Sequence, residues 1–187
     1  MQELFTPRLR LLPAAPIWAL QTADFYRRNA EHLAPWEPRR EGQADPARQV
    51  EFLSMAASAA AEGQALRWLL SDDGWRVIGV IGVSNIARGH HQSASLGYSL
   101  DANCQGRGLM HEALGAVMAE AFAPGLNLHR LQAAWQPHND RSQRLLHRLG
   151  FRDIGLAKDY LCIAGAWRDH QLSERLNPAF QTPPEWC

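Results

Sequence analysis

The chain has 187 residues, of which 46% are hydrophobic, enough for one compact domain with a substantial core and too few to expect two. Its nineteen basic and nineteen acidic side chains cancel, so it lacks the positive field that contact with a nucleic-acid backbone requires. We therefore expect a single domain over residues 1–187, with an irregular Pro-rich tail over 177–187, and no direct nucleic-acid partner.

The cysteine and histidine content argues against a disulfide scaffold and against a metal site. Cys104, Cys162 and Cys187 are an odd number without metal-type spacing, and the histidines show no zinc-ligand pattern. We expect no metal and a reducing, cytoplasmic location. The N-terminal segment has no apolar core of a signal peptide, and the longest apolar run, 77–83, is too short to cross a bilayer, so no membrane partner is expected.

The first half of the chain predicts a strand, two helices and an antiparallel meander. A strand over 9–13 precedes a helix over 15–34, which ends before Pro35. A second helix has Asp45 as its N-cap, Pro46 at its first position and Gly63 at its end. Three strands follow, and the Asp-Asp-Gly turn at 72–74 predicts a hairpin between the first two. Their expected ranges are 65–71, 75–87 and 93–100.

The second half predicts two further helices, over 108–122 and 139–149, with a strand over 129–136 between them. A strand from Phe151 and a hairpin that returns over 168–176 complete the order β-αα-βββ-α-β-α-ββ. This order predicts an α+β fold with a mixed, mostly antiparallel twisted sheet of about seven strands and about four flanking helices.

The stretch SLDANCQGRGLMHEAL, from Ser99 to Leu114, predicts a strand, a glycine-punctuated turn and then a helix. Gly106 and Gly108 keep side chains away from the helix N-terminus, where free N–H groups and the helix dipole favour an anion. The turn lacks the Gly-Lys-Ser/Thr ending of a nucleotide P-loop and is not a dinucleotide fingerprint. From these residues alone, a phosphate site and a merely tight turn are both open.

QGRGLMHEA resembles the pyrophosphate-binding motif of the GNAT (Gcn5-related) N-acetyltransferases, Gln/Arg-x-x-Gly-x-Gly/Ala, with Gln105 and Gly108 in register and Met110 where Gly or Ala is usual. NDRSQRLLHRLGF, over 139–151, resembles the second signature of that superfamily. The chain is most similar to its RimJ/RimL ribosomal-protein N-terminal acetyltransferases, of the RimJ type. Further matching stretches are TPRLRLLP, HLAPWEP and AKDYLCIAGAWRDHQL.

The resemblance implies acetyl-CoA as cosubstrate and a set of cofactor-binding residues. The pantetheine arm pairs with the strand before the turn, and the diphosphate binds the turn itself. Carried over residue by residue, the set is Tyr98, Ser99, Leu100, Gln105, Gly106, Arg107, Gly108, Leu109, Met110, Asn139 and Ser142. Arg107 and Arg141 are candidates for contact with cofactor phosphates, or else solvated surface charges.

The position of the usual tyrosine general acid of the family is occupied by Leu146. Ser142, four residues earlier on the same helical face, is the expected catalytic substitute, although a serine at a helix start often only caps it. Asn139 is a candidate N-cap of the same helix.

The resemblance implies an acceptor site near Trp36, Glu37, Asp159 and Tyr160. Glu37, Asp159 and Tyr160 are candidates for the general base, and for each a solvated surface position is the alternative. Trp167 is a further candidate for the acceptor pocket.

The expected activity is acetylation of a protein N-terminal α-amine, with the fifth protein of the small ribosomal subunit as the implied acceptor, by a monomer or homodimer. Two alternatives stay open: an acetyltransferase for a small amine, such as an antibiotic or polyamine, and a non-catalytic module that binds CoA or ribosomes.

Overall fold

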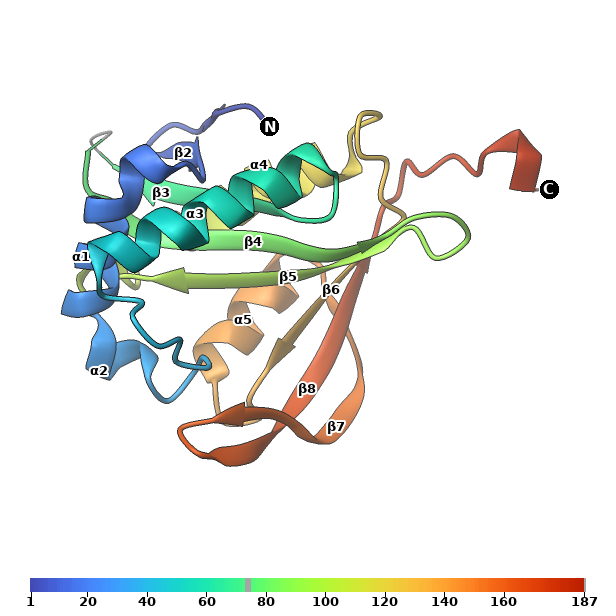
Figure 1. The fold of residues 1–187 in the computed structure, drawn as a ribbon. Helices are drawn as coiled ribbons and strands as arrows, with labels where there is room; N and C mark the ends of the chain where they lie inside the picture. The colour runs from blue at the N-terminus through green and yellow to red at the C-terminus, as the bar shows by residue number, and fades with distance from the viewer. Residues whose placement is uncertain (73–74, 187) are drawn as a thin grey trace.

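In a computed structural model, which describes residues 1–72 and 75–186, one mixed sheet organises the chain (Figure 1). The strand order is β1-β2-β3-β4-β5-β6-β8-β7, and every neighbouring pair is antiparallel except β5 and β6. The strands are β1 (Leu4–Phe5), β2 (Arg10–Pro13), β3 (Leu66–Ser71), β4 (Val77–Ala87), β5 (Ser93–Leu100), β6 (Arg130–Trp135), β7 (Arg152–Ile163) and β8 (Ala166–Leu176). The α-helices are α1 (Ala19–Arg28), α2 (Ala30–Leu33), α3 (Pro46–Ala61), α4 (Leu109–Phe122) and α5 (Asp140–Arg148).

The predicted α+β order is confirmed, with two differences. The described residues form eight strands rather than about seven, because the short β1 pairs with β2. The helix expected over 15–34 is divided: a 3₁₀ turn, Pro16–Trp18, precedes α1, and the chain breaks at Asn29 before α2. β3 and β4 form the predicted antiparallel pair, while residues 73–74 of the predicted turn lie outside the described residues.

Local end signals place three helices where the sequence predicts them. Asp45 caps α3 by accepting a hydrogen bond from the Ala47 N–H, and Pro46 is its first residue. Gly108, with φ +75°, precedes α4, and the Asn139 side chain caps α5 by accepting from the Ser142 N–H.

The two faces of the sheet carry separate clusters of buried side chains. Trp68 and Ile81 belong to the cluster that includes the apolar side of α4. Leu69 and Val80, neighbours on the same strands, belong to the cluster that includes residues of α1 and α3. Helices therefore cover both faces of the sheet, and α3 crosses in front of β3 and β4 in Figure 1.

β5 and β6 pair over three residues only, Ser93–Ser95 with Arg130–Gln132. Beyond these residues the two strands diverge, with α5 close to the widening end (Figure 1). The segment Leu96–Leu100 is paired with β4 on one side and has no described strand partner on the other. We call the region where β5 and β6 diverge the seam. There the N–H and C=O groups of Leu96–Leu100 that face β6 have no described strand partner, although they lie in the interior of the sheet.

No helix in the described part of the chain is long and apolar enough to cross a membrane.

Candidate active site

The turn from β5 to α4 starts at a buried carboxylate. Asp101 is fully buried, and its carboxylate accepts hydrogen bonds from Arg28 Nε at 2.7 Å, Asn29 Nδ2 at 3.2 Å and the Asn103 N–H at 3.0 Å. Burial alone raises the pKa of Asp101, but these hydrogen bonds and the Arg28 charge outweigh it and lower the pKa. Asn29 Oδ1 also accepts from the Ala102 N–H at 3.0 Å, so the break between α1 and α2 fixes the start of the turn.

The glycine loop, residues 105–110, presents backbone rather than side chains. Gly106 and Gly108 have φ of +74° and +75°, a region that other residues rarely adopt, while Leu109 and Met110 bury their side chains in the core. The first N–H bonded within the helix is that of Glu112, which donates to Gly108 O at 3.1 Å. Among the described residues, none accepts a hydrogen bond from the N–H groups of 106–110. The loop is therefore a set of free donors at a helix N-terminus, which suits an anion.

The Gln105 side chain connects this loop to two helices. Its Nε2 donates to His32 Nε2 of α2 at 2.7 Å, and its Oε1 accepts from Arg141 in the first turn of α5. Gln105 thus links α2 and α5 across the loop.

Two predicted residues from different elements meet where α5 approaches β5. The Tyr98 hydroxyl lies 2.5 Å from Ser142 Oγ, and the Ser142 N–H donates to the Asn139 cap at 3.2 Å. Burial raises the pKa of Tyr98 to about 12, against a smaller lowering by the Ser142 hydrogen bond, so the phenol keeps its proton at neutral pH. Leu146, at the position of the usual family acid, is fully buried in the core.

A carboxyl group lies on the opposite face of β5. Ser99 follows Tyr98 and therefore faces the other side of the sheet, where its hydroxyl is near enough to Glu37 to lower the pKa of that carboxyl. Burial raises the pKa of Glu37, and the charges of Arg67 and Arg40 and the Ser99 hydroxyl offset this only in part. The Tyr98–Ser142 hydroxyl pair thus lies on one face of β5, and a carboxyl group of raised pKa lies on the other.

Contacts with the end of β6 hold the loop that carries Glu37. Gln136, which is buried, donates from Nε2 to Pro35 O at 2.5 Å, and the Trp36 ring lies 5.3 Å from the His138 ring. The loop after α2 therefore lies against the residues that follow β6, next to the wide end of the seam.

Asp159 and Tyr160 lie in an irregular part of β7, where the pairing with β8 shifts between Ala157 and Leu161. The Asp159 N–H donates to Asp169 Oδ1 at 2.9 Å, and the Tyr160 ring lies 5.4 Å from the His170 ring. Both contacts are to β8. Of the three candidate bases, Glu37 is therefore the one whose pKa is influenced by a side chain of β5, that of Ser99. A hollow of about 500 Å³ lies nearby, lined by Gln136, Pro137, His138, Trp167, Arg168 and Asp169.

The sequence model of the acetyltransferase (GNAT) domain family matches residues 8–152, about three quarters of the chain. The chain belongs to the GNAT acetyltransferase family. It is 41% identical, over 98% of its length and 92% of the relative, to the [ribosomal protein uS5]-alanine N-acetyltransferase of Escherichia coli.

Solved structures of GNAT relatives share the fold. The ribosomal-protein-S5-alanine acetyltransferase from Vibrio fischeri matches 97% of this chain and 100% of its own with a TM-score of 0.91 and 32% identity. Mycobacterium smegmatis RimJ, solved in complex with CoA-disulfide, matches 97% of this chain and 88% of its own with a TM-score of 0.87 and 27% identity.

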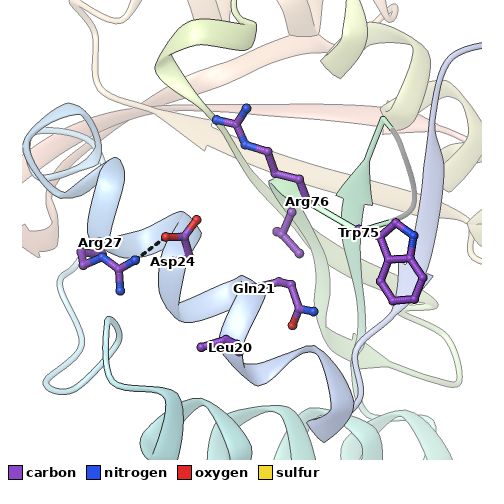
Figure 2. Close-up of a pocket in the computed structure, with 7 residues that line it drawn as sticks. Leu20, Gln21, Asp24, Arg27, Trp75 and Arg76 are labelled. Atoms are coloured by element: carbon purple, nitrogen blue, oxygen red, sulfur yellow. Dashed lines mark hydrogen bonds and ion pairs between the residues drawn. The ribbon is translucent and has the colours of Figure 1, made fainter.

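A second hollow in this GNAT chain, of about 460 Å³, lies between α1 and the start of β4. Figure 2 shows its lining, where Asp24 pairs with Arg27 on α1 and the Trp75 ring lies on the side of β4. Its lining residues, Leu20, Gln21, Asp24, Arg27, Trp75, Arg76 and Val77, include none of those predicted for the GNAT site.

Sequence reasoning missed three side chains that connect the elements of the candidate site: Asn29, His32 and Gln136. His32 begins the matching stretch HLAPWEP, so that stretch could have identified it. Asparagine has a low helix propensity, so Asn29 in the predicted helix could have indicated the break between α1 and α2. Gln136 directly follows β6 and gives no signal of its own, because its partner Pro35 is 101 residues away.

Proposed function

We propose that this protein transfers the acetyl group of acetyl-CoA to the N-terminal α-amine of a protein, and that its acceptor is ribosomal protein uS5. The observation that carries the acceptor is the 41% identity, over nearly the whole chain, to the [ribosomal protein uS5]-alanine N-acetyltransferase of Escherichia coli. The seam and the glycine loop supply a physical basis for the cosubstrate.

Acetyl-CoA has hydrogen-bond acceptors that suit the backbone N–H groups left free in the glycine loop and along β5. Its diphosphate accepts hydrogen bonds from the N–H groups of the glycine loop, and its pantetheine arm pairs with β5 at Tyr98, Ser99 and Leu100. Arg107 and Arg141 face the phosphates from the loop and from α5. Three observations support this assignment: the free N–H groups, the unpaired side of β5 and the CoA-disulfide bound to the relative from Mycobacterium smegmatis.

Transfer begins with a neutral amine, because only its lone pair attacks the thioester carbon. Glu37 accepts the proton that the amine loses, directly or through water, and its raised pKa brings a carboxylate closer to the proton affinity that this step needs. An α-amine has a pKa of about 7.7 to 8.0, so a weak base suffices. A backbone N–H of β5 stabilises the oxyanion of the tetrahedral intermediate.

Collapse of that intermediate forms the amide and expels the CoA thiolate, which takes the Ser142 proton while Ser142 Oγ takes the Tyr98 proton; the proton that the amine gave to Glu37 returns to Tyr98 through solvent. Tyr98 supports this step, since its hydroxyl is hydrogen-bonded to Ser142 Oγ and keeps its own proton at neutral pH. Leu146 has no proton to give, and Ser142 lies one helical turn before it on the same side of α5.

The acceptor is tested with the purified protein, acetyl-CoA and a peptide that has the N-terminal sequence of uS5. A second peptide has the same sequence with its α-amine blocked and one lysine free. Mass spectrometry should find one added acetyl group on the first peptide and none on the second. Acetylation of small amines such as polyamines with no change in the first peptide would contradict the proposed acceptor. No acetylation of any amine would favour a non-catalytic binding module.

A further inference from the structure

The segment before β2 is hydrogen-bonded to the first turn of α4 through the carboxylate of Glu112. Glu112 Oε1 accepts hydrogen bonds from Thr6 Oγ1 at 2.5 Å and from the Arg8 N–H at 2.9 Å. Glu112 Oε2 accepts from Arg8 Nε at 2.7 Å and lies 2.7 Å from Arg8 Nη2. The planar guanidinium and the carboxylate thus pair through two nitrogens, a geometry that holds both side chains in one orientation.

The same guanidinium reaches the glycine loop. Arg8 Nη1 donates to Arg107 O at 2.9 Å, and the Glu112 N–H donates to Gly108 O at 3.1 Å. The Arg107 carbonyl is therefore held by the Glu112 side chain through Arg8, whereas the Gly108 carbonyl is held by the Glu112 backbone N–H. Since a trans peptide unit is planar, its N–H points away from its C=O. Fixing the Arg107 carbonyl through Arg8 therefore fixes the direction of the Gly108 N–H group.

We propose that Arg8 and Glu112 are positioning residues for the diphosphate of acetyl-CoA, because together they hold the Arg107 carbonyl and so orient the Gly108 N–H group of the glycine loop toward it. The inference rests on the proposed function, since it concerns the same site. It assigns a binding role to residues outside the glycine loop itself.

The charge of Arg8 is already balanced within the protein. Burial raises the pKa of Glu112, but the hydrogen bonds from Thr6 and Arg8 outweigh this and lower the pKa, so the carboxylate is ionised at neutral pH. The Arg8–Glu112 pair is then neutral overall. Arg8 therefore acts through the backbone it holds rather than as a free charge on the phosphates.

The experiment compares two ligands of the purified full chain. Inorganic pyrophosphate, as a competitive inhibitor against acetyl-CoA, probes the diphosphate subsite alone. S-acetylpantetheine is an acetyl donor without a diphosphate, so its turnover reports the transfer centre and the integrity of the fold. The variants are Glu112→Gln, Arg8→Met and Arg8→Lys, and the control is Arg48→Met, which breaks an exposed ion pair with Glu51 on α3.

All three site variants should raise the inhibition constant of pyrophosphate about tenfold, equivalent to about 1.4 kcal/mol, and change S-acetylpantetheine turnover less than about twofold. Arg8→Lys belongs to this set because an ammonium lacks the fork that reaches Glu112 and Arg107 O together. The double variant Arg8→Met/Glu112→Gln should be little worse than either single variant, since both act through one contact. Arg48→Met should change neither quantity.

Three results would overturn the inference. Weaker pyrophosphate binding in Arg8→Met alone, with Arg8→Lys and Glu112→Gln unchanged, would make Arg8 a direct phosphate ligand. Equal losses with both ligands would make the pair a general support of the fold. Unchanged inhibition in every variant would remove the pair from the site. A wild-type protein that binds neither acetyl-CoA nor pyrophosphate would instead overturn the proposed function, and this inference with it.

Discussion

The hydroxyl groups of Tyr98 and Ser142 lie 2.5 Å apart, although Tyr98 is on β5 and Ser142 is in the first turn of α5. Because burial raises the pKa of Tyr98 to about 12, the pair carries no charge at neutral pH. A phenol that donates to Ser142 Oγ leaves the serine proton free for a third group. In the proposed reaction that third group is the departing thiolate, so two neutral hydroxyls replace the single tyrosine usual in the family.

Replacement of Ser142 by Ala should lower kcat about 100-fold, because the thiolate then leaves without a proton donor. The affinity for acetyl-CoA should stay within about twofold, since Ser142 acts on the leaving group and not on the diphosphate. Steady-state kinetics and calorimetric titration measure the two quantities. Ser54→Ala is the matched control, because the Ser54 hydroxyl bonds only to Val50 O of its own helix. Equal activity of the two variants would remove Ser142 from the mechanism.

Replacement of Tyr98 by Phe keeps the buried ring and removes only the hydroxyl that meets Ser142. We expect kcat to fall about fivefold, the size of one neutral hydrogen bond. In the Ser142→Ala background the same change should have almost no further effect, because the hydroxyl acts through Ser142. Full and independent effects in the double variant would show that Tyr98 works by another route, such as a direct contact with pantetheine.

Replacement of Glu37 by Gln should lower kcat about 100-fold, because the amide does not accept the proton of the attacking amine. In the wild type, kcat should fall on the acid side as Glu37 is protonated, at a pH above the ordinary glutamate value, since burial raises its pKa. This acid limb should disappear in Glu37→Gln. An acid limb that persists unchanged in the variant would assign that limb to a group other than Glu37.

The same substitution should make the protein more stable at neutral pH. A carboxyl with a raised folded pKa binds its proton more tightly in the folded than in the unfolded chain, so its contribution to stability decreases as the pH rises from the unfolded to the folded pKa. The amide side chain of the variant has no charge to bury. Thermal unfolding at pH 7 should therefore give a higher Tm for Glu37→Gln than for the wild type, and a lower Tm would contradict the burial of this group.

Replacement of Asp101 by Asn should lower the free energy of unfolding by about 3 kcal/mol, because it leaves the Arg28 guanidinium without its buried partner. Because the pKa of Asp101 is lowered in the folded protein, its contribution to stability is fully present above the ordinary aspartate pKa of 3.8. That contribution is lost as the pH falls through the folded pKa. Urea unfolding at pH 7 measures the first effect. The pH dependence is measured by unfolding the wild type and the variant between about pH 5 and about pH 2. The difference between their free energies of unfolding should become smaller as the pH falls.

The sequence predicts those helices and turns whose ends are determined by residues close together in the chain. Asp45 and Pro46 start α3, and Asn139 starts α5, because a capping side chain bonds a backbone group only two or three residues away. The glycines at 106 and 108 are equally local, since their positive φ belongs to the residue itself. The family motif could therefore be placed on the right turn without knowledge of the rest of the fold.

Features that depend on distant partners could not be predicted in this way. The break at Asn29 exists because its side chain bonds Asp101 and the Ala102 N–H, 72 and 73 residues further along the chain. The choice of Glu37 as the proposed base among three candidates needed its burial and its nearness to Ser99, which no spacing in the sequence reveals. Such pairings are set by how strands and helices assemble rather than by local preference.

Because the seam is the proposed binding place of CoA, the cellular concentration of CoA should affect how long the protein survives. Along Leu96–Leu100, every second residue directs its N–H and C=O toward the side that β6 has left. In the proposed complex the pantetheine arm forms an additional strand of the sheet, and a ligand at 100 times its Kd adds about 2.7 kcal/mol to the stability of the folded state. Folded chains in a cell are degraded through their unfolded fraction, so starvation for CoA would shorten the survival of this protein as well as deprive it of its acetyl donor.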